Sequence, residues 1–121
     1  MADKVLIIVA NSDPCDAQQM LTPLAQAMVA AAMEYRVEII FTGRCVDLVR
    51  SASAASSVIL SDGRVIYDIL KETCMSGVSL KVCTMALEVE ITELIPEVVA
   101  RVGGSYLIGE AMDDATETFT Y

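Results

Sequence analysis

The chain has 121 residues, enough for one domain over residues 1–121, and 55% of them are hydrophobic, yet no apolar run approaches the roughly 18–20 residues that span a bilayer. Its 17 acidic and 8 basic side chains give a net charge of −9, which argues against a general nucleic-acid binder and against attachment to an anionic membrane surface. It contains no histidine, which excludes Ser-His-Asp and Cys-His catalytic groups and removes the commonest zinc ligand.

The first half of the chain alternates between strand-like and helix-like segments. A continuous apolar run at residues 4–10 is typical of a central parallel strand. Helical spacing predicts a long helix over residues 16–34. Pro23 lies inside this range, so either the helix starts at Pro23 with Thr22 as its cap, or the helix is kinked there. After it come a strand at residues 37–41, a short helix at residues 45–49, and a polar segment at residues 51–57 that reads as a mobile loop or a frayed helix end.

The second half repeats this alternation. At most a short strand is expected at residues 58–60, and a helix at residues 64–76 is ended by Gly77. Further segments are a buried strand at residues 78–83, a helical turn at 92–97, a strand at 98–102, a helix at 105–112 and a last strand at 116–121. Strands separated by helices predict βαβ units, right-handed crossovers and a mainly parallel sheet.

Four cysteines, Cys15, Cys45, Cys74 and Cys83, carry most of the potential chemistry. They form no CxxC pair, so neither a zinc ribbon nor a thioredoxin-type motif is expected. Since residues 1–4 lead straight into a strand and not into a signal peptide, we expect reduced thiols in the cytoplasm. Cys74 follows the helical spacing of its segment and is interpreted as a packing residue. The other three each follow an apolar run and are expected at the carboxyl edge of the sheet, where open α/β sheets bind ligands.

Cys83 lies where a buried strand ends and a segment with helix formers begins. If that segment is helical, its unpaired N–H groups and positive dipole end favour the nucleophilic thiolate, whereas the alternative is a buried structural cysteine. Lys81 shares the face of Cys83 on a strand, and Arg44 follows the second strand on the same edge, so these two are the nearest candidates for stabilising negative sulfur. Each is also interpretable as a solvated surface charge. Glu88 and Glu90 would raise the pKa of the thiol if they pointed inward.

The sequence predicts no bound cofactor and no metal. There is no GxGxxG after the first strand, no GxxxxGK[ST] motif, and no flavodoxin-type phosphate loop. The loop at residues 11–16 holds Asp13 and Asp16 and no glycine, so it would repel a phosphate; these carboxylates are better suited to capping the first helix. Nucleotide or flavin binding is therefore not expected.

These segments together resemble the DsrE/DsrF-like family, which includes the TusD-type sulfur relay subunits. The resemblance rests on residues 5–11, the long helix after them, the segment Val82-Cys83-Thr84-Met85-Ala86 at the family's cysteine strand end, and residues 106–108 and 118–121. It implies a three-layer α/β fold with helices on both faces of a mainly parallel sheet. It also implies that Cys83 carries sulfane sulfur as a persulfide and exchanges it with a small TusA-like carrier protein. Cys15 and Cys45 match no family residue and inherit no role.

Three functions remain open at this point. The first is a cytoplasmic sulfur carrier or sulfurtransferase that uses Cys83, and the second is a non-catalytic oligomeric binding or regulatory protein on the same fold. The third is a redox sensor or thiol peroxidase-like protein that pairs Cys83 with Cys15 or Cys45. A homo-oligomer is expected because the apolar fraction is high, and the resemblance favours a trimer or a dimer of trimers. Small side chains that would let helices approach closely are Ala25, Ala27, Ala30, Ala31 and Ala32.

Overall fold

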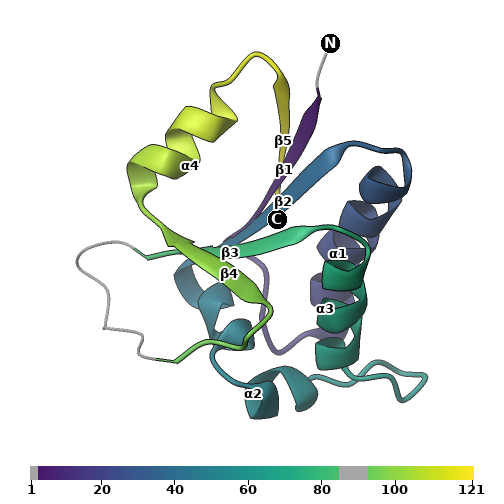
Figure 1. Ribbon diagram of the computed structural model, residues 1–121. Helices are drawn as coiled ribbons and strands as arrows, with labels where there is room; N and C mark the ends of the chain where they lie inside the picture. The colour runs from purple at the N-terminus through teal and green to yellow at the C-terminus, as the bar shows by residue number, and fades with distance from the viewer. Residues whose placement is uncertain (1–2, 85–92) are drawn as a thin grey trace.

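The computed structural model, which describes residues 3–84 and 93–121, shows a parallel sheet with helices on both faces (Figure 1). Within these residues the sheet has the strand order β4-β3-β2-β1-β5, with β1 (Lys4–Val9), β2 (Arg36–Thr42), β3 (Ser79–Cys83), β4 (Val98–Val102) and β5 (Thr116–Thr120). The helices are α1 (Ala17–Ala32), the 3-10 helix η1 (Gly43–Val49), α2 (Ala52–Ser56), α3 (Ile66–Met75) and α4 (Gly104–Ala111). None of the helices in this part of the chain is long and apolar enough to cross a bilayer.

Different helices cover the two faces of the sheet (Figure 1). On one face, α1 and α3 pack with alternate residues of the strands in the larger hydrophobic core. On the other face, α4 packs over a smaller cluster that contains Leu6, Ile8, Ile40 and Cys83. Successive strand residues point to opposite faces, so the continuous apolar runs supply both cores at once. The predicted three-layer α/β fold is confirmed, and every strand pairing in the described residues is parallel.

The helix α1 begins where Asp16 caps it. The Asp16 carboxylate accepts hydrogen bonds from two backbone N–H groups of the first turn, at 3.0 and 3.1 Å. The interpretation in which the helix starts at Pro23 with Thr22 as its cap is therefore wrong. Pro23 lies inside the helix and is buried, so packing against the core offsets the hydrogen bond that it cannot donate. The helix stops before the predicted end because Glu34 takes a left-handed conformation with φ of 70°.

Two short segments follow η1, for which the sequence predicted a loop or frayed helix end and at most a short strand. Residues 51–57 contain the helix α2, which forms because the Ser51 hydroxyl accepts a hydrogen bond from the Ala54 N–H at 3.0 Å. Residues 58–60 form no strand of the sheet; Ile59 makes one isolated antiparallel bridge. Both segments are too short for their apolar pattern to decide between a strand, a helix and a loop.

The strands β4 and β5 form the two edges of the sheet and lie where the sequence places them. The helical turn predicted for residues 92–97 is wrong in its described part, since residues 93–95 are coil and Pro96, which has no N–H to donate, lies in a turn. Between the edges, β1 is paired with both β2 and β5. The carboxyl ends of β1, β2 and β3 therefore meet at one edge of the sheet, the edge where the candidate site lies.

Candidate functional site

Cys83 is the last residue of β3, at the carboxyl edge of the sheet. In the register it stands beside Thr42 of β2 and Val102 of β4, so a strand flanks it on each side. The prediction that it ends a parallel strand is confirmed. Its side chain faces α4, and the residue is only 2% exposed. The partly buried side chains of Tyr106, Leu107 and Ala111 pack against its cluster from α4.

The segment that follows Cys83 lies outside the described residues. Residues 85–92 include the predicted helical start, whose dipole was expected to favour a thiolate. They also include Glu88 and Glu90, the carboxylates expected to oppose it. Both expectations therefore stay predictions.

The other thiols at this edge lie in different surroundings. Cys15 is exposed in the loop after β1, whereas Cys45 is completely buried in the larger core, on the α1 side of the sheet. The Cys45 thiol donates a hydrogen bond to the Ser12 carbonyl at 3.1 Å, and burial raises its pKa. Cys45 and Cys83 thus pack against opposite faces of the sheet, which gives no support to a disulfide between them.

Cys74 lies on α3, away from this edge, and has a packing role. It is partly buried against the larger core, and its thiol contacts the Glu97 carbonyl at 3.6 Å. Burial raises the pKa of the Cys74 thiol, so the thiolate is disfavoured there. The interpretation of Cys74 as a packing residue agrees with this environment.

Arg44 holds two loops together at the carboxyl edge. Its guanidinium donates to the carbonyl oxygens of Asn11 and Ser12, at 3.0 and 3.1 Å. These bonds connect the loop after β1, which carries Cys15, to the start of η1. A role for Arg44 in stabilising negative sulfur remains a prediction, while its contacts with the loop give it a structural role.

Lys81 does share the α4 face with Cys83, but its ammonium group turns away from the thiol. The Lys81 Nζ lies 3.2 Å from Glu38 Oε1 and donates to the Tyr106 hydroxyl at 2.9 Å. In the register Glu38 stands beside Ser79, which is on the amino side of Lys81, whereas Cys83 is on its carboxyl side. The positive charge of Lys81 is therefore balanced by Glu38 in this structure.

Lys81 belongs to a buried polar network that sequence reasoning missed. Glu38 is 5% exposed and lies at its centre, with its other carboxylate oxygen 2.8 Å from Lys4 Nζ. Lys4 also pairs with Glu110 of α4 at 2.8 Å, and the Tyr106 hydroxyl donates to Glu38 at 2.8 Å. The only signal of this network in the sequence was the presence of charged residues inside apolar strands. Because alternate residues of a strand point to the same face, charged residues two positions apart lie on one face of the sheet.

The network shifts the pKa values of its members in opposite directions. Burial alone would raise the pKa of the Glu38 carboxyl, but hydrogen bonds from the two lysines and Tyr106 outweigh burial and lower it. Burial alone would lower the pKa of Lys4 and Lys81, but their hydrogen bonds to the carboxylates and to Tyr106 raise it. All three groups are therefore held in their charged forms under the α4 layer.

We expect the stability that this network contributes to be constant between about pH 5 and pH 10 and to fall outside that range. Glu38 has a lowered pKa when folded, so its contribution is present above its unfolded value of 4.5 and is lost as pH falls through the folded pKa. The lysines have raised pKa values, so their contribution is present below 10.5 and is lost as pH rises through the folded pKa. Urea unfolding of wild type and Glu38→Gln across pH should show a difference that shrinks at both extremes; a difference independent of pH would contradict this expectation.

Comparison with known proteins supports the resemblance found in the sequence. The model of the DsrE/DsrF-like family matches residues 4–121, which is essentially the whole chain. No curated protein matches the chain.

Proposed function

Because the chain belongs to the DsrE/DsrF-like family, we propose that it is a cytoplasmic sulfur carrier or sulfurtransferase that holds sulfane sulfur as a persulfide on Cys83. The family indicates a role in sulfur relay, and the proposed partner is a small TusA-like carrier protein. The observation that carries the proposal is the position of Cys83 at the carboxyl end of β3, between two other strands. Ligands of open α/β sheets bind at this edge.

The proposed reaction is an exchange between sulfur atoms and needs no outside oxidant or reductant. The Cys83 thiolate attacks the outer sulfur of a donor persulfide; a new S–S bond forms on Cys83 while the S–S bond of the donor breaks. The donor leaves as a thiolate and takes up the proton that Cys83 gave up. In the second step a carrier thiolate attacks the outer sulfur on Cys83, and the Cys83 thiolate is the leaving group. Neither step requires a histidine, a metal or a flavin.

The two alternatives make different use of the same thiol. A redox sensor would need a second thiol near Cys83, and the burial of Cys45 on the opposite face of the sheet does not favour that pairing. A non-catalytic binding or regulatory protein would use the fold alone and would leave Cys83 as a packing residue, which its 2% exposure allows.

Mass spectrometry of the protein after incubation with a sulfane-sulfur donor separates these functions. A gain of one sulfur atom on the peptide that contains Cys83 supports the carrier. A loss of two hydrogen atoms shared between two cysteine peptides supports the redox sensor. An unchanged mass at all four cysteines would contradict the proposed function and leave the binding protein.

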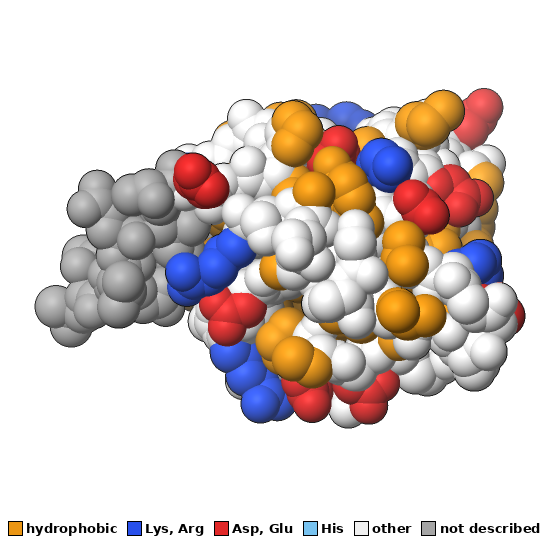
Figure 2. Space-filling view, turned by 90° about the horizontal axis from the view of Figure 1, so that it is seen from below, with side chains coloured by type: hydrophobic (Ala, Val, Ile, Leu, Met, Phe, Trp, Pro, Cys, Tyr) orange, Lys and Arg blue, Asp and Glu red, His pale blue; other side chains and the backbone are white. Residues whose placement is uncertain are grey.

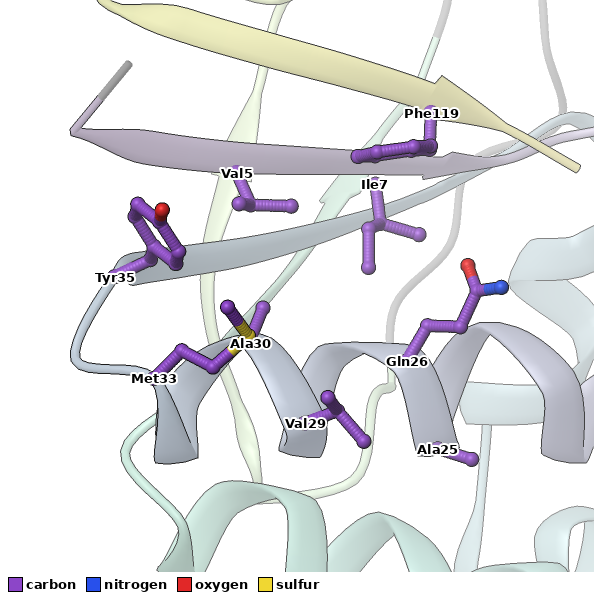
Figure 3. Close-up of a pocket in the computed structure, with 9 residues that line it drawn as sticks. All are labelled: Val5, Ile7, Ala25, Gln26, Val29, Ala30, Met33, Tyr35 and Phe119. Atoms are coloured by element: carbon purple, nitrogen blue, oxygen red, sulfur yellow. The ribbon is translucent and has the colours of Figure 1, made fainter. Parts of the chain in front are cut away.

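We also propose that the chain forms a homo-oligomer, a trimer or a dimer of trimers, through an apolar groove beside β5. The groove has a volume of about 440 Å³ and lies between the outer part of α1 and the sheet (Figure 3). Its exposed apolar side chains include Val29 and Met33, each 62% exposed, and Phe119, 49% exposed. Two of the alanines expected to allow close approach, Ala25 and Ala30, also line it. Figure 2 shows one face of the molecule, on which apolar side chains lie in groups among polar and charged atoms.

We expect Met33→Glu to dissociate this oligomer, because a carboxylate in an apolar contact between copies is costly to desolvate. Light scattering at micromolar concentration would show the mass falling to that of the 13.0 kDa monomer. The matched control is Met75→Glu on α3, where the methionine is 88% exposed and lies outside the groove. A wild-type protein that is already monomeric would contradict the proposal, as would equal dissociation by both substitutions.

A further inference from the structure

Cys83 is covered on the α4 side of the sheet, although sulfur transfer requires it to be reached. The residue is 2% exposed, and Tyr106 and Leu107 of α4 pack against its cluster. Attack on a sulfur atom needs direct approach of the incoming sulfur, so a persulfide cannot form or be emptied while the Cys83 thiol stays buried. An element that covers Cys83 must therefore move during each transfer.

Among the helices of the described chain that pack on the sheet, α4 is held by the least apolar burial. The helices α1 and α3 each contribute three buried residues to the larger hydrophobic core, whereas α4 contains no buried residue. Its apolar contact with the smaller cluster consists of partly buried side chains. Segments with few buried apolar contacts open at a lower free energy than the core does. The burial pattern thus identifies α4 as the element that separates most easily from the sheet.

Among the described residues, two side chains of α4 make polar contacts that hold the helix against the strands. Near its start, the Tyr106 hydroxyl donates to Glu38 at 2.8 Å and accepts from Lys81 at 2.9 Å. Near its end, the Glu110 carboxylate binds Lys4 at 2.8 Å. Hydrogen bonds to charged groups are stronger than neutral ones, and these lie in a largely buried layer.

We propose that α4 is a cover over Cys83 and that Tyr106 and Glu110 are positioning residues that set how often the thiol becomes reachable. Their partners Lys4, Glu38 and Lys81 project from three adjacent strands, so the contacts fix both ends of α4 over the sheet. This inference rests on the proposed function in one respect: it takes Cys83 to be the sulfur carrier that has to be reached. Weakening either contact increases access to the thiol without changing the thiol itself.

The test is the rate at which iodoacetamide alkylates each cysteine of the native protein, read peptide by peptide with mass spectrometry. We expect Tyr106→Phe to accelerate alkylation of Cys83 about tenfold, since it removes a hydroxyl bound to two charged groups. A smaller acceleration is expected for Glu110→Gln, because the amide oxygen can still accept a hydrogen bond from Lys4. Cys15 is exposed and serves as the internal reference for reagent reactivity.

Two controls separate local opening of α4 from general loss of stability. Cys45 is buried on the opposite face, so its alkylation rises only if the whole domain opens. Tyr67→Phe is the matched substitution, because the Tyr67 hydroxyl of α3 donates to Glu97 at 2.9 Å, away from α4. We expect Tyr67→Phe to leave the alkylation of Cys83 unchanged.

Unchanged alkylation of Cys83 in both α4 variants would overturn the proposal, as would an equal acceleration at Cys45 and Cys83. This outcome is distinguishable from failure of the proposed function, because alkylation needs no sulfur donor. If Cys83 never gains sulfur but the α4 variants still expose it, the carrier function fails and the cover remains. If Cys83 gains sulfur and the variants change no rate, the cover alone is wrong.

Discussion

Cys83→Ser is expected to abolish sulfur loading and transfer while the protein keeps its fold and its assembly. Serine is nearly isosteric with cysteine, but its hydroxyl is not a comparable acceptor of sulfane sulfur. The substitution places a hydroxyl in the apolar cluster of Leu6, Ile8 and Ile40, so we expect it to cost roughly 1–2 kcal/mol of stability. Mass spectrometry after treatment with the donor measures loading, and urea unfolding measures the stability cost.

The remaining cysteines provide matched controls for this substitution. Cys15→Ser should keep full loading, since Cys15 is exposed and lies in a surface loop. Cys45→Ser and Cys74→Ser change buried or partly buried thiols with raised pKa values, so they should affect stability more than loading. Persulfide formation that persists in Cys83→Ser and disappears in one of the other variants would move the active thiol and refute the assignment.

The second large effect is expected from Glu38→Gln, which removes the carboxylate that, among the described residues, contacts both Lys4 and Lys81. Lys4 keeps Glu110 as a partner, but Lys81 loses the only carboxylate with which it is paired in the described residues. Breaking a buried ion pair by removing one partner costs about 3–5 kcal/mol. Because Lys81 is only partly buried and keeps the Tyr106 hydroxyl as a partner, we expect a loss toward the lower end of that range. Urea unfolding at neutral pH measures this loss.

A second substitution tests the cause of that loss. Adding Lys81→Met to Glu38→Gln removes the uncompensated charge, so the double variant should be more stable than Glu38→Gln alone. The control is Asp68→Asn, which breaks the exposed pair with Lys71 on α3 and should change stability little. A Glu38→Gln protein as stable as wild type would show that the network contributes nothing.

Local sequence patterns were sufficient to predict most of the elements and the position of Cys83. The apolar runs at β1, β2 and β3 and the spacing in α3 are local signals, since each reflects burial that recurs with the period of its element. The predicted carboxyl edge follows from the same pattern, because parallel strands end together. The prediction of a helical turn failed at residues 93–97, where the segment is too short to show a helical period and the residues around Pro96 form a turn.

The surroundings of Cys83 could not be predicted, because they depend on distant parts of the chain. Whether a helix lies over the thiol depends on which face of the sheet the connection from β4 to β5 crosses. The hydrophobic periodicity of a single segment does not indicate that face. The polar network joins Lys4 to Glu110, which are 106 residues apart. Lys81 was correctly placed on the face of Cys83, but its pairing with Glu38 needed the register between β2 and β3.

The pairing of β1 with β5 has a consequence for the order of folding. The helix α4 and the strand β5 both follow Cys83 in the chain, so a ribosome produces the thiol before it produces the helix that covers it. Contacts between residues so far apart form slowly, because the chain must close a large loop before it gains any energy from them. During synthesis and refolding, the half of the sheet that includes Cys83 therefore passes through a stage in which the thiol is open to oxidants and sulfur donors, and closure of α4 ends that stage.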